Sequence, residues 1–197
     1  MKNILVLFSH PKFEKSRANS ILADKIKDKV GVTFHDLYER YPDFNVDVDA
    51  EKELMEAHDI IIFHHPFYWY SCPPLMKQWI DMVLEFGWAY GPAGNALLDK
   101  KWLNVITTGG SKAMYCENGT NCYAINDFLR PFQQTANLCG MRYLPPFAVM
   151  NTHKIEDKKL HAYAEQYDKL IDLLVEDAVV AEVGNISFLN DIPQLNA

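Results

Sequence analysis

The stretch DIIIFHHPFYWYSCPP, residues 59–74, decides the fold that the sequence predicts. Its first part, residues 59–63, is a short β-branched apolar run that is typical of a buried strand. Its two final prolines suit the first turn of a helix, where backbone N–H groups have no acceptor. Between them Phe67, Tyr68, Trp69 and Tyr70 occupy a loop at the carboxyl end of a predicted parallel strand, where open α/β sheets bind ligands. Such a loop can form the wall of a site for a flat molecule, whereas the plainer interpretation is a hydrophobic plug under a surface loop.

On both sides of this stretch, apolar runs alternate with segments of helical periodicity. Strands are expected at residues 4–8, 32–37, 60–63 and 102–107, with a fifth from residues 141–144 and 147–150, which flank a Pro-Pro pair. Helices are expected at residues 16–30, from Asp47 or Asp49 to Ala57, at 75–86, at about 125–139 with Pro131 as a kink or restart, and around 160–174. This order predicts an α/β domain over residues 1–177, with a doubly wound five-stranded parallel sheet and helices on both faces. Residues 178–197 lose the periodicity and are expected to pack on a partner subunit or to be loose.

Composition narrows the function. A chain of 197 residues fits one domain, and its net charge of −7 without a basic stripe argues against a nucleic-acid partner. No apolar run is long enough for a membrane span or a signal peptide. The four cysteines lack a C-x-x-C pair, so we expect reduced thiols in the cytoplasm and no metal site.

A second loop follows the first predicted strand and ends where the first helix begins. His10, Ser16, Arg17 and Asn19 offer donors, and Ser16 suits the N-cap position. The free N–H groups and the positive end of a helix attract phosphate, although a serine there is ordinarily only a cap.

A third loop, Thr107, Thr108, Gly109 and Gly110, follows the fourth predicted strand. Its hydroxyls and glycines let the backbone approach a ligand closely, although a tight turn explains them too. Together the loops offer a phosphate end, a flat apolar wall and backbone donors, which are the needs of FMN. The G-x-G-x-x-G fingerprint of dinucleotide binding is absent after the first strand.

Two tyrosines are further candidates for the site. Tyr115 lies shortly after Gly110, and its phenol could donate a hydrogen bond to an oxygen that gains charge. Tyr90 is a second aromatic candidate for contact with substrate. For both, the alternative is an ordinary packing residue.

The ordered motifs resemble the flavodoxin-like NAD(P)H:quinone oxidoreductases. They are SHP and RAN in residues 9–19, YPDFN at 41–45, HPFYWYS at 65–71, GWAYG at 87–91, TTGG at 107–110 and LPPF at 144–147. The bacterial members that accompany glutathione-gated potassium-efflux antiporters show the strongest likeness. The resemblance implies a flavodoxin-like fold and a homodimer with the flavin near the subunit interface.

The resemblance also assigns roles to residues. It implies that the ribityl phosphate is held by His10, Ser16, Arg17, Ala18 and Asn19. The isoalloxazine would lie against residues 67–70 and 107–110, with Trp69 and Tyr90 near the substrate. A Tyr and a His assist hydride transfer in the mammalian enzymes of this family. Tyr115 matches that Tyr, but Asn121 stands in place of the His, and Pro92 replaces an aromatic residue that contacts substrate.

The sequence therefore predicts an FMN-dependent enzyme in which NAD(P)H reduces the flavin and a quinone or related electrophile then takes two electrons, with ping-pong kinetics. FAD is the alternative cofactor. One alternative function is a regulatory ancillary subunit of a potassium-efflux antiporter, which would place the protein at the inner membrane through its partner. The other is a one-electron carrier of the flavodoxin type.

Overall fold

The computed structural model describes residues 1–178 and 186–196 and contains a parallel sheet in the order β2-β1-β3-β4-β5, with β6 also paired to β4. The strands are β1 (Ile4–Phe8), β2 (Val32–Asp36), β3 (Ile60–Pro66), β4 (Lys101–Thr107), β5 (Arg142–Tyr143) and β6 (Phe147–Val149). The doubly wound parallel sheet is confirmed. Its predicted fifth strand is two short strands, because Pro145 and Pro146 have no N–H to donate to the ladder.

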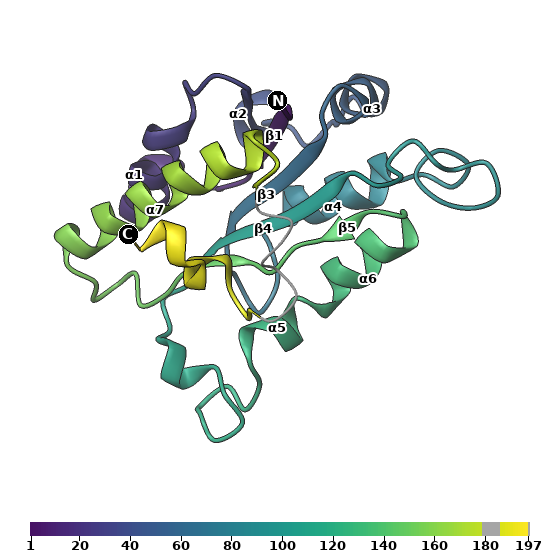
Figure 1. Cartoon of the computed structure of the whole chain (residues 1–197). Helices are drawn as coiled ribbons and strands as arrows, with labels where there is room; N and C mark the ends of the chain where they lie inside the picture. Colours follow the sequence, from purple (N-terminus) through teal and green to yellow (C-terminus); the bar gives the residue numbers. More distant parts are fainter. Residues whose placement is uncertain (179–185, 197) are drawn as a thin grey trace.

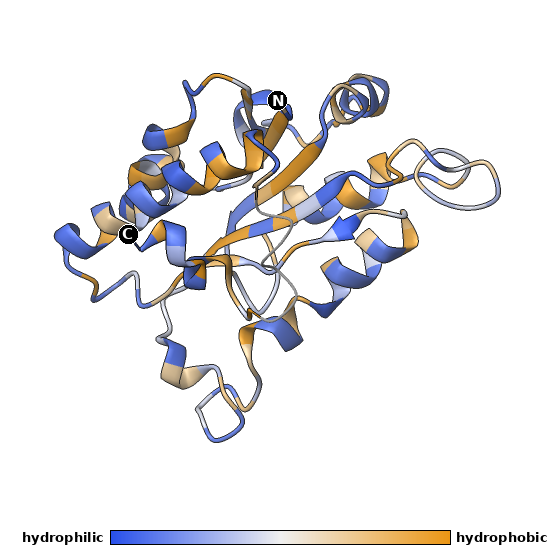
Figure 2. Ribbon diagram, viewed as in Figure 1, coloured by the Kyte–Doolittle hydropathy of each residue, from blue (hydrophilic) through white to orange (hydrophobic). Residues whose placement is uncertain are grey.

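Helices cover both faces of the sheet (Figure 1). One face is covered by α1 (Arg17–Ile26) and α7 (Asp157–Val175), and the other by α2 (Leu37–Arg40), α3 (Val48–Glu56), α4 (Pro74–Val83), α5 (Ile125–Phe128) and α6 (Arg130–Leu138). Alternate strand residues enter opposite cores: Ile4 and Val6 face α1 and α7, whereas Leu5 and Leu7 face the other helices. Figure 2 shows this as apolar central strands between helices with hydrophilic outer faces. No helix within the described ranges is long and apolar enough to cross a membrane.

The main differences from the sequence prediction lie at the ends of three elements. α1 ends at Ile26 rather than residue 30, and Val30 is 90% exposed instead of buried. β3 continues to Pro66, three residues further than expected, because both faces of the sheet remain covered there. The helix expected at 75–86 ends at Val83, where Leu84 leaves the helical conformation. Pro131 restarts a helix, as one of the two alternatives predicted, because its missing N–H is harmless in the first turn of α6.

The described part of the C-terminal tail packs on its own chain. Two 3₁₀ turns, η5 (Leu189–Asp191) and η6 (Pro193–Leu195), bury Leu189, Ile192 and Leu195 against the α7 side of the core. The packing of this tail on a partner subunit stays a prediction, and residues 179–185 lie outside the described residues.

One buried carboxylate joins three elements on the α3 side. Glu51 of α3 accepts hydrogen bonds from the Tyr41 hydroxyl (2.5 Å), His35 Nε2 (2.8 Å) and Trp79 Nε1 (2.7 Å). Burial alone would raise the pKa of Glu51, but the hydrogen bonds from His35, Tyr41 and Trp79 hold that pKa below its ordinary value. The ionised carboxylate therefore stabilises the attachment of α3 to β2 and α4.

We expect Glu51→Gln to lower the free energy of unfolding near pH 7 by about 1.5–3 kcal/mol, the value of hydrogen bonds to a charged group. Because the folded-state pKa is depressed, this stability is present above the unfolded value of about 4.5 and is lost as the pH falls through the folded value. Urea unfolding of both proteins at several pH values measures this. A gap between the two that does not shrink in acid would contradict the role of the charge.

Candidate active site

An open cleft of about 580 Å³ lies at the carboxyl ends of β1, β3 and β4. Ten of the residues predicted for cofactor binding line it: His10, Ser16, Arg17, Ala18, Asn19, Phe67, Tyr68, Trp69, Thr107 and Gly109. Sequence reasoning missed Lys12, Lys15, Pro66, Thr152 and His153, which line it too. Three loops that are distant in the sequence are thus brought to the carboxyl ends of the strands, where open α/β sheets bind ligands.

The start of α1 is arranged to receive an anion. Ser16 is the N-cap, and its Oγ accepts from the backbone N–H of Asn19 (3.3 Å) and from Asn19 Nδ2 (2.9 Å). Both acceptor positions of the hydroxyl are therefore used, and its own proton is left to donate into the cleft. The N–H groups of Arg17 and Ala18, first in the helix, have no intrahelical acceptor. These donors and the helix dipole favour a phosphate at this point.

Asn19 fixes this end of the cleft to the sheet. Its side chain is buried, and Nδ2 also lies 3.1 Å from Thr107 Oγ1 at the end of β4. One amide thus sets the position of the Ser16 hydroxyl relative to the third loop. The sequence indicated Asn19 as a direct donor, and the structure adds this link between two loops.

His10 presents a neutral ring to the cleft. The backbone N–H of Lys12 donates to His10 Nδ1 (3.1 Å), so the proton of the neutral imidazole is inferred to be on Nε2. Burial lowers the pKa of His10, although Glu14 opposes this effect. The ring is therefore an uncharged N–H donor at neutral pH.

The Arg17 side chain has other partners than the cleft. Its guanidinium donates to Asp157 Oδ1 (2.6 Å) and to the carbonyl oxygens of Thr152 (2.9 Å) and Ile155 (2.8 Å). It thereby holds the loop before α7 against α1. Within the cleft, the backbone N–H of Arg17 is the group placed to contact an anion.

The aromatic loop closes in a tight turn with unusual residues. The N–H of Ser71 donates to the Tyr68 carbonyl (3.0 Å), and Trp69 and Tyr70 have φ angles of +50° and +63°. A turn with two left-handed central positions favours Asn and Gly, and each non-glycine residue there costs about 1–3 kcal/mol. Trp69 is 92% exposed, so the fold gains little burial from it in return. Strain of this kind concentrates at functional sites.

The glycines of the third loop admit side chains from two other loops. A Cβ on Gly109 would lie 2.5 Å from the His153 ring, and one on Gly110 would lie 2.9 Å from the Tyr115 ring. Only glycine leaves room for both rings at these positions. His153 comes from the loop after β6, which carries no motif, and only its place after a strand could have indicated it.

Tyr115 and Asn121 lie beside the aromatic turn rather than among the lining residues of the cleft. The Tyr115 ring is 6.0 Å from that of Phe67, which lines the cleft, and the Tyr70 hydroxyl donates to Asn121 Oδ1 (3.3 Å). Burial raises the pKa of Tyr115, and the Thr108 hydroxyl opposes this effect. The phenol therefore keeps its proton at neutral pH and can donate a hydrogen bond.

Tyr90 is not among the residues that line the cleft. It lies in the loop between α4 and β4, next to Phe86, and nearby Trp88 bonds to Glu56 at the end of α3. That loop joins the end of a helix to the start of a strand, so it belongs to the opposite edge of the sheet (Figure 1). A role for Tyr90 at the substrate stays a prediction that requires a second subunit.

Residues 2–171 match a protein family whose description is a flavodoxin-like fold. An uncharacterized NAD(P)H oxidoreductase of Bacillus subtilis strain 168, YdeQ, is 44% identical over 167 residues, 85% of each chain. The glutathione-regulated potassium-efflux system ancillary protein KefG of Enterobacter sp. strain 638 is 42% identical over 164 residues, 83% of this chain and 90% of the relative.

Two solved structures are similar along the same region. General stress protein 14 of Treponema denticola, in complex with FMN, superposes with a TM-score of 0.82 at 35% identity, covering 87% of this chain and 99% of that chain. An NADPH-quinone reductase from P. pentosaceus superposes with a TM-score of 0.78 at 29% identity, covering 85% of this chain and 96% of that chain.

Relief of the strained turn should stabilise the fold. We expect Trp69→Asn to raise the free energy of unfolding by about 1 kcal/mol, because Asn adopts the left-handed conformation more readily. Trp69→Phe is the matched control and should leave stability unchanged. Urea unfolding of the flavin-free protein measures both, and an equal or lower stability of Trp69→Asn would contradict the assignment of strain.

Proposed function

The chain belongs to the flavodoxin-like family of NAD(P)H oxidoreductases, and from this we propose that it is an FMN-dependent enzyme that reduces quinones or related electrophiles by two electrons at the expense of NAD(P)H. The observation that carries the proposal is that the N-terminus of α1, the aromatic turn and Thr107 meet in one cleft. The FMN-bound and quinone-reductase relatives support it.

The residues fit FMN. The donors at Ser16, Arg17 and Ala18 suit a monophosphate, and the aromatic turn can cover one face of a flat ring. Gly109 lines the cleft without a side chain of its own, so a ligand can approach its backbone closely. When bound there, FMN would supply the hydride chemistry between the nicotinamide and the acceptor.

The protein's own residues would bind, shield and donate. Ser16 and His10 Nε2 would hold the phosphate, with Asn19 fixing the Ser16 hydroxyl. Phe67, Tyr68 and Trp69, which line the cleft, would exclude water from the ring. Tyr115 would donate a hydrogen bond at the polar edge, which strengthens as negative charge develops there. Asn121, which accepts from Tyr70, is a neutral amide and cannot exchange a proton, so no imidazole supports Tyr115 at this position.

We further propose a homodimer. Tyr68, Trp69, Tyr70 and Tyr123 expose aromatic surface around the cleft, which a second subunit would cover. The same contact could bring Tyr90 of the second subunit to the substrate. Sedimentation at micromolar concentration tests this, and a flavin-loaded monomer would contradict it.

The KefG relative supports a second candidate function, that of an ancillary protein of a potassium-efflux antiporter. Binding to an antiporter would not require a change in the cleft, so the same chain could serve both functions. Co-purification with an antiporter distinguishes an ancillary role from free-standing catalysis.

A negative charge added at the N-terminus of α1 tests the proposed cofactor. Ser16→Asp keeps a good N-cap but places a carboxylate where the phosphate would bind. We expect FMN affinity to fall about tenfold to a hundredfold, equivalent to one charge-assisted hydrogen bond. Ser20→Asp is the control, because Ser20 lies on the same helix outside the cleft lining. Equal FMN affinity of folded Ser16→Asp and the wild type would remove the phosphate from this site.

Tyr115→Phe tests the proposed donor. Loss of one hydrogen bond to developing charge should slow flavin reduction by NAD(P)H about tenfold to a hundredfold, with little change in flavin affinity. Anaerobic stopped-flow bleaching of the flavin measures this step. Tyr123→Phe is the control, since Tyr123 is exposed and also contacts Phe128. Reduction of Tyr115→Phe at the wild-type rate would leave Tyr115 with a packing role only.

A further inference from the structure

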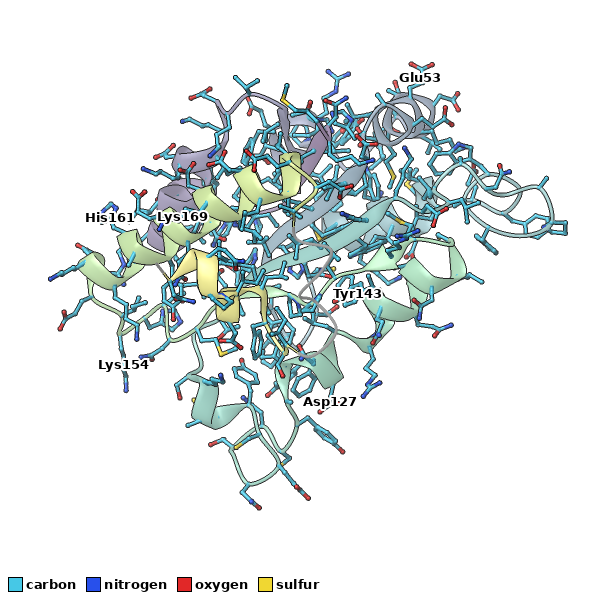
Figure 3. The ribbon with its side chains drawn as sticks, viewed as in Figure 1. Glu53, Asp127, Tyr143, Lys154, His161 and Lys169 are labelled. Carbon is cyan, nitrogen blue, oxygen red and sulfur yellow. The ribbon has the colours of Figure 1, made fainter. Side chains whose placement is uncertain are left out.

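The C-terminal strap, residues 186–196, lies outside the part of the chain that the family match covers. It runs between α7 and α5 in Figure 1, and Figure 3 labels Asp127 of α5 and Tyr143 of β5 near it. We propose that this strap positions the Tyr115 loop, residues 111–124, against the sheet and so acts as a positioning element of the active site. The catalytic part of this inference rests on the proposed function.

The strap is anchored on the edge of the sheet. Asn190 Oδ1 accepts from the backbone N–H of Ala148 in β6 (2.8 Å), and the N–H of Leu189 donates to the Pro146 carbonyl (3.0 Å). The buried side chains of Leu189 and Ile192 enter the same core as α7. These contacts pair one N–H group of β6 and one carbonyl just before it, backbone groups that would otherwise lack a protein partner.

The far end of the strap is tied to α7. Asn196 Nδ2 donates to the carbonyl oxygens of Asn190 and Ile192, both at 3.0 Å, and Gln166 Nε2 of α7 donates to Asn196 Oδ1 (2.7 Å). The strap is therefore held at both its sheet side and its helix side. It can serve as a fixed support for a neighbouring segment.

The near end of the strap touches the Tyr115 loop at its start and just after its end. The Lys112 ammonium lies 5.4 Å from the centre of the Phe188 ring, and Asn126 Nδ2 of α5 donates to the Ser187 carbonyl (3.1 Å). Phe188 is half-buried in the same apolar cluster that contains Tyr115 and Phe128. Both ends of the segment that carries Tyr115 thus rest on the strap.

The Tyr115 loop needs such support because its own hydrogen bonds are local. Within the described residues, the N–H groups of Met114, Tyr115 and Asn121 donate to acceptors inside the loop itself. The bond from the Tyr70 hydroxyl to Asn121 (3.3 Å) ties the loop to a strained turn rather than to a regular element. Segments with few long-range contacts open readily unless a neighbour restrains them.

Phe188→Ala tests the positioning role, because it removes the contact to Lys112 but keeps the Leu189 and Asn190 anchors. In flavin-free protein, the amides of Met114, Tyr115 and Asn121 should exchange hydrogen about fivefold to thirtyfold faster, as expected for a weakened local restraint. Phe188→Tyr should restore the wild-type exchange. Leu173→Ala, which removes a half-buried apolar side chain of α7 outside the strap, is the matched control and should leave these amides unchanged.

In flavin-loaded protein, Phe188→Ala should lower kcat by a similar factor without a change in FMN affinity, since the phosphate end lies on α1. In a Tyr115→Phe background, Phe188→Ala should have no further effect on kcat, because the positioned group is already gone. Unchanged amide exchange in Phe188→Ala would overturn the proposal that the strap restrains the Tyr115 loop, whether or not the protein is a reductase. Faster exchange with an unchanged kcat, or an additive loss in the double variant, would overturn its role in positioning Tyr115. Absence of flavin binding would instead overturn the proposed function and leave the exchange test standing.

Discussion

The parallel pairing of β1, β3 and β4 is the constraint on which the candidate site depends. Because the three strands run in one direction, their carboxyl ends meet at one edge, and the loops that follow them share one cleft. The strands are buried on both faces, so a shift of register would move polar residues into one of two apolar cores. The packing of the sheet therefore sets the position of the cleft, and the loops provide the side chains and backbone groups that line it.

Because both faces of the sheet are buried, the polar side chains at the end of β3 must find hydrogen-bond partners inside the protein. His65 faces the α6 side, where its Nδ1 bonds to the Pro66 carbonyl (3.0 Å) and its Nε2 lies 3.2 Å from Asn104 Nδ2. Asn104 Oδ1 in turn accepts from Trp102 and Tyr143, both at 3.0 Å. Burial lowers the pKa of His65 to about 4, so the ring stays neutral and the network keeps one arrangement. His64 faces the other core, as alternation along a strand predicts, and burial lowers its pKa to about 3.

Local patterns in the sequence predicted most elements because each pattern has a local cause. Ser16 caps α1 and Asp47 caps α3 through side-chain bonds to nearby N–H groups, which depend only on neighbouring residues. The end of α1 could not be predicted from the apolar period alone, because Val30 continues that period although α1 ends at Ile26 and Val30 is exposed. Contacts between residues distant in the sequence could not be predicted either. The sequence indicates that Arg17 can donate to a phosphate, whereas the fold places Asp157 beside its guanidinium. His153 and the strap were missed for the same reason, since their role arises from position and not from a motif.

The two ends of the candidate site are held by different physics, and this separates affinity from rate. Hydrogen bonds among Ser16, Asn19 and Thr107 fix the anion end between a helix and a central strand, both of which belong to the rigid core. Aromatic contacts fix the Tyr115 end, where Phe128 lies 6.3 Å from Tyr115 and stacks on Tyr70 at 4.9 Å. Hydrogen bonds specify one geometry, whereas ring contacts tolerate small displacements with little loss of energy. A change in the core near α1 should therefore alter how tightly a phosphate binds. A change in the strap or the aromatic cluster should instead alter how well Tyr115 is aimed.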